Sequence, residues 1–352
     1  MQRREFLKVF AGAAVAGPGI ARAQAAMPVI GYLAAGSPEA FASRLDALRG
    51  GLGDYGYAEG RNVAIEPRWA SGIYDQLQAF AADLVARKVD VIVALGPPSL
   101  RAAAAATSTI PVVFVVGSDP VRDGIVASMS RPDRNLTGIT FLAVDLTPKR
   151  LQLAAELAPQ AKRVALLANP SNRAEERVIA DAQTAAGTAG LDLAVLGASN
   201  DSGIDAAFAA LQQSSAGMLL VSPDSLFTTR AERIAALAIQ HKIPTLFAFR
   251  EAVLAGGLAS YGPVTARIHR DVGRYVGRIL KGDRPGDLPV LQPTTFELIV
   301  NLKTAKALGL EIAPMILARA QQRGRRLWRI VERLRERALI RERERNDLRF
   351  NS

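Results

Sequence analysis

Five short turns in the sequence combine proline with serine, aspartate or asparagine, and each follows an apolar run. They are Gly36–Pro38, Gly96–Ser99, Gly117–Pro120, Asn169–Asn172 and Ser222–Ser225. Ser, Asp and Asn side chains cap helix starts, and proline is favoured at the first helical position. A helix start presents free N–H groups and the positive end of the helix dipole. Turns of this kind that converge would suit a small anionic or zwitterionic group such as a carboxylate.

The candidate ligand-binding residues are polar and glycine positions of these turns, together with one tyrosine in a later turn. They are Ser37, Gly96, Ser99, Asp119, Asn169, Ser171, Asp224 and Tyr261. Aromatic rings near the same turns are candidates for holding an apolar or planar ligand body. Besides Tyr261, these rings are Tyr32, Phe114, Phe141 and Phe249. A single capping residue is usually structural, so the prediction depends on the recurrence of the pattern in two halves of the chain.

Residues suited to catalysis or metal binding are scarce. The chain has no cysteine and two histidines, His241 and His269. This composition excludes disulfides, thiol catalysis and thiolate metal sites, and it argues against a site of several histidines. We expect His241 to cap the end of a helix, and His269 to lie on a basic helix face with Arg267 and Arg270. We predict no catalytic residues, no metal and no cofactor.

Two charged residues, Arg250 and Glu251, follow the end of a predicted strand. They could contact a ligand, pair with each other or face solvent, and we expect them to be solvated. The segment 51–56 matches G-x-G-x-x-G, but a helix precedes it, whereas the dinucleotide fingerprint requires a strand there. We therefore interpret its glycines as helix-ending and turn residues.

Short β-branched runs alternate with alanine-rich amphipathic stretches from residue 28 onward. Strands are predicted at 29–33, 63–69, 89–94, 112–116, 163–168, 191–196, 218–221, 245–248, 258–261 and 296–301. Helices are predicted near 39–53, 73–87, 98–107, 172–189, 203–214, 227–240, 264–281 and 303–308. Nearly continuous apolar strands indicate parallel sheets covered on both faces. The predicted fold class is α/β, with two doubly wound parallel-sheet lobes joined by a multi-strand hinge, and ligands bind beyond the carboxyl ends of such strands.

The predicted organisation has four parts. Residues 1–26 are a cleaved export signal, and 319–352 are a basic C-terminal extension. Residues 27–140 form the first lobe, completed by part of 255–290. Residues 141–254 form the second, completed by part of 291–318. The segment Gly138–Asp145 is predicted to cross between the lobes.

The charge of the chain is concentrated at its ends. The net charge is +11, of which residues 1–26 carry +3 and residues 319–352 carry +7, leaving +1 for the body. A nearly neutral body provides no footprint for a phosphate backbone, so we expect no nucleic-acid partner. The first segment has a basic start, a short apolar run and small residues spaced by one, which is typical of a signal peptide. Its RREFLK at 3–8 resembles the twin-arginine motif. These features predict a soluble, exported, periplasmic protein.

The body of the chain also carries a series of distinctive stretches. They are LRGGL at 48–52, YAEGRNV at 57–63, IPVVF at 110–114, DPV at 119–121, RPDRNLTG at 131–138, GGLASYGP at 256–263, LPV at 288–290 and NLKTAKALGL at 301–310. Across roughly 28–318 the chain resembles the periplasmic substrate-binding proteins of ABC transporters, in the group that includes tryptophan- and tyrosine-type binders. It departs from them at Asp133–Arg134, where glycines are common, and in its basic extension, which could be an amphipathic helix or a solvated appendage.

The resemblance implies a type I periplasmic binding fold and a monomer that is not an enzyme. It would capture a small organic solute, such as an amino acid or an aromatic or other carboxylate. The hinge would close over the solute and present it to the membrane permease of an ABC transporter. The sequence leaves three alternatives open: an enzyme on the same scaffold, a ligand-sensing regulator, and the sensor lobe of a membrane receptor.

Overall fold

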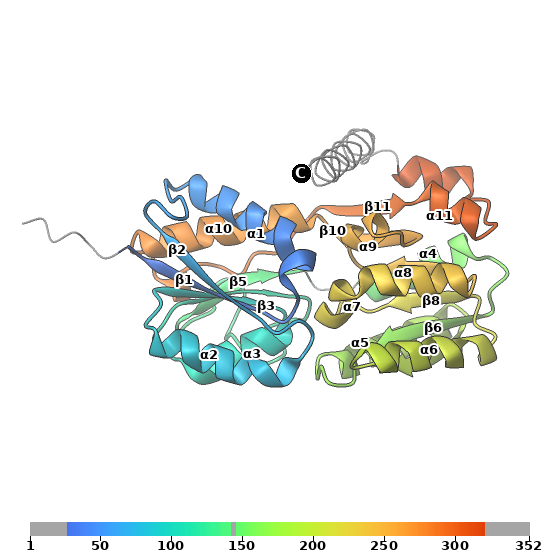
Figure 1. The fold of residues 1–352 in the computed structure, drawn as a ribbon, viewed down its shortest axis with the longest axis horizontal. Coiled ribbons are helices and arrows are strands. Elements are labelled where there is room, and N and C mark those ends of the chain that lie inside the picture. Colours follow the sequence, from blue (N-terminus) through green and yellow to red (C-terminus); the bar gives the residue numbers. More distant parts are fainter. Residues whose placement is uncertain (1–26, 142–145, 321–352) are drawn as a thin grey trace, which may run out of the picture.

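Two β-sheets lying side by side organise the chain (Figure 1). A computed structural model describes residues 27–141 and 146–320. The first sheet has the strand order β2-β1-β3-β4-β5, and all its pairs are parallel. The second has the order β11-β10-β9-β8-β6-β7, and it is parallel except for the antiparallel pair of β10 and β11. The predicted fold class, α/β with two parallel-sheet lobes, is confirmed.

The first lobe contains five strands and the helices that cover them. The strands are β1 (Val29–Ala34), β2 (Ala64–Trp69), β3 (Val91–Leu95), β4 (Val112–Val116) and β5 (Leu136–Thr140). The helices are α1 (Pro38–Gly53), α2 (Leu77–Ala86), α3 (Pro97–Ala106) and α10 (Thr265–Leu280), with the short 3-10 turns η1 (Tyr74–Gln76) and η3 (Pro285–Asp287). Helices α1 and α10 pack on one face of the sheet, while α2 and α3 pack on the other.

The second lobe repeats this architecture. Its strands are β6 (Arg163–Ala168), β7 (Asp192–Gly197), β8 (Met218–Val221), β9 (Thr245–Phe247), β10 (Ala259–Pro263) and β11 (Phe296–Val300). Its helices are α4 (Thr147–Leu157), α5 (Glu175–Thr188), α6 (Asp201–Gln213), α7 (Ser225–Thr229), α8 (Ala231–Gln240), α9 (Arg250–Leu254) and α11 (Leu302–Ala307). Side chains of α4, α5 and α11 share one apolar core with the sheet, and those of α6, α7 and α8 share the other.

Three passages of the chain link the lobes. They lie between β5 and α4, between β10 and α10, and between Leu291 and β11. Leu291 belongs with the first lobe because its N–H donates to the Gly138 carbonyl beside β5. The prediction that Gly138–Asp145 only crosses between lobes was wrong in its first part, since Leu136–Thr140 is a paired strand of the first sheet. A Cβ at Gly138 would lie 2.2 Å from the Phe114 carbonyl oxygen, so glycine at this position allows β5 to pair closely with β4.

Helices α1 and α10 are far apart in sequence but pack closely. A Cβ atom at Gly51 would lie 2.0 Å from the Arg270 carbonyl oxygen, and one at Gly273 would lie 2.1 Å from that of Leu48. Glycine at both positions therefore allows the two backbones to touch. Gly51 thus has a packing role besides lying near the helix end, as predicted. This contact holds α1 and α10 together on one face of the first sheet.

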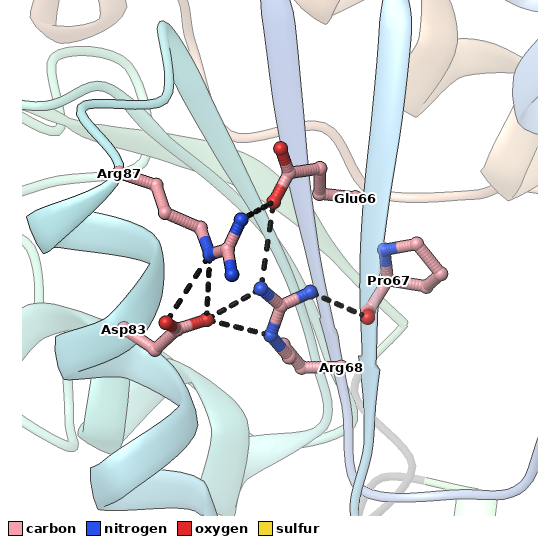
Figure 2. Close-up of polar contacts among 5 residues, drawn as sticks. All are labelled: Glu66, Pro67, Arg68, Asp83 and Arg87. Carbon is pink, nitrogen blue, oxygen red and sulfur yellow. Dashed lines mark hydrogen bonds and ion pairs between the residues drawn. The ribbon is translucent and has the colours of Figure 1, made fainter.

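A cluster of ion pairs ties the edge strand β2 to α2 (Figure 2). Arg68 Nε donates to Asp83 Oδ2 at 2.8 Å, and Arg68 also pairs with Glu66 at 3.4 Å. Arg87 pairs with the same two carboxylates at 3.1 and 3.4 Å. All four side chains are at least 20% exposed, and exposed pairs contribute little stability each. The two arginines and the two carboxylates have no net charge together, so the cluster provides no positive site for an anion.

The predicted export signal lies outside the described residues, as does the C-terminal extension after its first two positions. Arg319, at the start of that extension, forms an ion pair with Glu156 of α4 at 2.5 Å. Within residues 27–141 and 146–320, no helix is both long enough and apolar enough to cross a membrane.

Candidate ligand-binding site

A cleft lies between the lobes, at the carboxyl ends of strands from both sheets. It contains about 550 Å³ of space free of protein atoms, part of it open to solvent. Its first-lobe wall consists of Phe41, Arg44, Leu95, Gly96, Pro97, Val115, Gly117, Phe141, Thr265, Ile268 and His269. Its second-lobe wall consists of Asn172, Pro223, Ser225, Thr228 and Phe249. This is the position at which parallel α/β sheets bind ligands, because the turns after their strands converge there.

The two lobes also bond to each other directly beside this cleft. The Tyr74 hydroxyl of the first lobe donates to Asp224 Oδ1 of the second at 2.6 Å and accepts from the Leu226 N–H at 3.3 Å. The Ser37 N–H donates to the Thr229 hydroxyl at 3.2 Å. These bonds join residues about 150 to 190 positions apart in the chain. Direct hydrogen bonds therefore hold the two lobes against each other beside the cleft.

Arg44 of α1 is the cationic side chain in the cleft wall, and it is only 7% exposed. Its guanidinium carbon lies 4.2 Å from the centre of the Phe41 ring and 4.9 Å from that of Phe249. Its Nε and Nη2 atoms are buried, and neither has a hydrogen-bond partner among the described residues. A buried cation needs a negative partner, because it has lost its hydration.

His269 of α10 lies in the same wall and is 2% exposed. Its Nδ1 is 2.8 Å from the Thr265 carbonyl oxygen, and its Nε2 is buried without a partner among the residues described. Burial and the positive charge of Arg44 lower the pKa of His269 to about 3. The ring is therefore neutral near pH 7. Since a carbonyl only accepts hydrogen bonds, Nδ1 carries the proton and Nε2 is an acceptor.

A buried polar network supports the second-lobe wall. Asp224 caps α7 by accepting from the Leu226 N–H, and it also accepts from Asn169 Nδ2 at 3.0 Å and Asn172 Nδ2 at 2.8 Å. With the Tyr74 hydroxyl, four donors satisfy this carboxylate, which is 1% exposed. Burial, and then the negative charge of Asp224, raise the pKa of the neighbouring Glu175 to about 8. The network holds Asn172 and the turn before α7 in position.

The predicted ligand-binding residues fall into two groups. Gly96 lines the cleft, with a φ of +90°, and a Cβ there would lie 3.3 Å from Ser225 Oγ across the gap. Ser37 caps α1 and donates its N–H to Thr229 of the other lobe, while Asn169 and Asp224 lie in the supporting network. The structure thus brings these four residues around the cleft, and their contact with a ligand stays a prediction.

The other four predicted residues do not line the cleft. Ser99 is fully buried in α3, and Asp119 bonds the N–H groups of Val121 and Arg122 in its own turn. Ser171 is exposed and donates its N–H to Asn169 Oδ1. The ring of Tyr261 packs on the apolar core that α4, α5 and α11 share with the second sheet, and its centre lies 6.5 Å from that of the Phe296 ring.

The predicted aromatic residues also divide. Phe141 and Phe249 line the cleft with their rings 5.7 Å apart, whereas Tyr32 and Phe114 are fully buried in the first-lobe cores. Their positions relative to the sheet explain this division. Phe141 and Phe249 follow the ends of β5 and β9, but Tyr32 and Phe114 lie inside strands.

Two other predictions were wrong. Arg250 and Glu251 are not solvated, because α9 turns them inward: Arg250 pairs with Glu297 at 3.2 Å, and Glu251 accepts from the Thr265 hydroxyl at 2.6 Å. His269 does not share the face of Arg267 and Arg270, both of which are exposed. His241, as predicted, caps a helix: its N–H donates to the Leu237 carbonyl at the end of α8.

Sequence reasoning missed Arg44 and His269 as cleft residues, although a signal was present. Arg44 is three residues after Phe41 and four before Leu48, so it lies on the apolar stripe of its helix. His269 likewise lies three residues before Val272 and seven before Val276. A charged or polar residue on such a stripe is a candidate for a buried function. Across the described part of the chain, no group of three or more His, Asp or Glu side chains is placed to hold a metal ion.

The family of this two-lobed chain follows from a match to a known protein family. A family model described as ABC transporter substrate binding protein matches residues 35–323. The chain belongs to this family. The family resemblance predicted from the sequence is therefore confirmed, and proteins of this family bind small-molecule solutes and interact with ABC permeases.

Three similar proteins illustrate the relationship. A curated relative named tyrosine-binding protein, from Clostridioides difficile (strain R20291), is 29% identical over 261 residues, 74% of each chain. A conserved domain protein from Vibrio cholerae has a solved structure with a TM-score of 0.78 and 27% identity, covering 84% of this chain and 98% of that one. An ABC domain in complex with L-Trp, from Streptococcus pneumonia, gives a TM-score of 0.75 at 23% identity, covering 83% and 98%. At this identity the last structure shows that the fold is shared.

Proposed function

We propose that this substrate-binding protein is exported to the periplasm and captures a small organic solute in the interlobe cleft. The solute is an amino acid or an aromatic or other carboxylate, and the closed protein delivers it to the permease of an ABC importer. The twin-arginine-like segment at 3–8 supports export, and the similarity to a tyrosine-binding protein supports this class of solute. We propose that the protein acts as a monomer, has no nucleic-acid partner and does not chemically change its solute.

The observation that carries this proposal is a cleft whose two walls come from different lobes, which also bond to each other directly. The chain passes between the lobes three times, so the lobes can rotate about these passages as rigid bodies. A solute that contacts both walls binds the closed arrangement more tightly than the open one. It therefore shifts the equilibrium toward closure.

A thermal-shift screen of the chain from residue 27 onward tests this function. The panel contains amino acids including L-tyrosine and L-tryptophan, aromatic acids, aliphatic acids and neutral sugars. A solute at 100 times its Kd adds about 2.7 kcal/mol to the free energy of unfolding, which is a readily measured rise in Tm. We expect at least one organic acid to raise the Tm and to be recovered unchanged after incubation. A panel without any stabilising solute would contradict the proposed function, and turnover of a bound solute would favour an enzyme.

A further inference from the structure

The polar groups in the cleft wall differ in charge. Arg44 brings a positive charge and His269 brings a neutral imidazole, whereas the remaining polar side chains, Asn172, Ser225, Thr228 and Thr265, are uncharged. No Asp or Glu side chain lines the described cleft. The wall between these groups is apolar, with the rings of Phe41, Phe141 and Phe249 and the side chains of Leu95, Val115 and Ile268.

Arg44 is held in place without being neutralised. Its guanidinium is fixed by the Phe41 ring of its own helix and by the Phe249 ring of the second lobe. Cation–π contacts of this kind position an arginine while leaving its N–H groups free. Nε and Nη2 are buried and unpartnered among the described residues, although this chain forms many ion pairs elsewhere. A carboxylate bound by these N–H groups would provide the missing negative charge.

His269 adds an acceptor close to this cation. Arg44 is near enough for its charge to act on the imidazole. The Thr265 carbonyl fixes the ring by accepting from Nδ1, which leaves the lone pair of Nε2 without a donor among the residues described. A buried acceptor without a donor costs free energy, and a solute hydroxyl or amine would remove that cost. Arg44 and His269 come from α1 and α10, which the contacts of Gly51 and Gly273 hold together.

We propose that Arg44 and His269 form the polar subsite of the cleft. Arg44 binds the carboxylate of the solute, and His269 Nε2 accepts a hydrogen bond from a hydroxyl or amine beside that carboxylate. This inference rests on the proposed function and narrows it. The solute is an α-hydroxy or α-amino acid with an apolar side chain that lies against Phe41, Phe141 and Phe249.

Two quartets of matched compounds test this subsite by calorimetry. For a benzyl side chain they are L-3-phenyllactate, L-phenylalanine, 3-phenylpropanoate and phenethylamine. For an isobutyl side chain they are 2-hydroxy-4-methylpentanoate, L-leucine, 4-methylpentanoate and isoamylamine. The hydroxy and amino acids keep both groups, the simple acids lack the donor, and the amines lack the carboxylate. Comparing the hydroxy acid with the amino acid shows whether a hydroxyl or an amine is the better donor to His269 Nε2.

Matched variants assign the contacts to residues. Arg44→Met keeps the length of the side chain and removes its charge, and Arg49→Met is the control, since Arg49 lies on the same helix in exposed ion pairs with Asp46 and Glu59. His269→Asn keeps an amide near Nδ1 and removes the acceptor at Nε2. His269→Gln places an amide oxygen near the position of Nε2, where it can accept the same hydrogen bond.

We expect the hydroxy or amino acid of at least one quartet to bind, and the corresponding amine not to bind. Loss of a charged hydrogen bond predicts that R44M weakens binding about 10- to 100-fold, while R49M leaves it unchanged. H269N should abolish the advantage of that acid over the simple acid, and H269Q should retain part of it.

Several results would overturn the subsite. One is an R44M variant that binds as tightly as the unmodified protein, and another is an amine that binds as well as its acid. A third is a different solute from the screen binding while all eight compounds fail. In each case the proposed function would survive, because a solute would still bind the cleft. The failure of every compound in the broad screen would contradict the function itself.

Discussion

Replacing Tyr74 with phenylalanine should weaken closure of the lobes without unfolding either of them. The Tyr74 hydroxyl bonds Asp224 Oδ1 at 2.6 Å and the Leu226 N–H at 3.3 Å, so both of its partners lie in the other lobe. A hydrogen bond to a charged group contributes about 1.5 to 3 kcal/mol. The closed-to-open ratio of Y74F should therefore fall about 10- to 100-fold. A solute that binds only the closed form loses up to the same factor in affinity.

Pulsed electron paramagnetic resonance can measure this change directly. The chain has no cysteine, so spin labels at Gln78→Cys in α2 and Glu176→Cys in α5 report one distance between the lobes. Both positions are exposed. Y74F should move the distance distribution toward longer values. Dissociation of a bound solute, followed by stopped flow, should also become faster.

Tyr275→Phe is the matched control. The Tyr275 hydroxyl donates to the Pro289 carbonyl at 2.7 Å, and both residues lie in the first lobe. This variant should lower the Tm and leave the interlobe distance unchanged. A Y74F protein with the same distance distribution and solute affinity as the unmodified chain would refute the role of Tyr74 in closure.

Two further predictions concern stability, both followed as Tm by circular dichroism. A Cβ at Gly273 would lie 2.1 Å from the Leu48 carbonyl oxygen, so G273A should cost about 1 to 3 kcal/mol. G53A, with no atom within 4 Å of its added Cβ, should be neutral or stabilising; equal losses would contradict the packing argument. Burial, and then the negative charge of Asp224, raise the pKa of Glu175 from 4.5 to about 8. The contribution of Glu175 to folding stability is therefore fully present below pH 4.5 and is lost as the pH rises through 8. E175Q, which imitates the protonated acid, should raise the Tm at pH 8.5 and not at pH 4.5, and a gain independent of pH would contradict this.

Much of the fold could be predicted from local pattern. Strands such as Val112–Val116 and Met218–Val221 were predicted at their observed bounds, because buried parallel strands are short, continuous apolar runs. The elements missed were β5, α4 and α9. The sequence of β5 is LTGIT. Its threonines, Thr137 and Thr140, can be buried because their hydroxyls donate to the Leu288 and Ser118 carbonyls. Those acceptors lie outside the strand, so its own sequence gives no indication of them.

The candidate site could be predicted less well than the fold. The turns at strand ends correctly indicated the edge where the cleft lies, and Gly96 is in its wall. A capping motif predicts a helix start, however, and Asp119 and Ser171 use their polar atoms within their own turns. Arg44 and His269 are brought together by packing between helices more than 200 residues apart. Such contacts are determined by tertiary structure, which a local motif does not report.

The most direct test of the account is a crystal structure of the chain from residue 27 grown with the acid that raises its Tm most. This acid should lie between the two lobes, with its carboxylate within hydrogen-bond distance of Arg44 and its apolar part against Phe141 and Phe249. A solute bound elsewhere on the protein, or an Arg44 that still lacks a negative partner in the complex, would contradict the account.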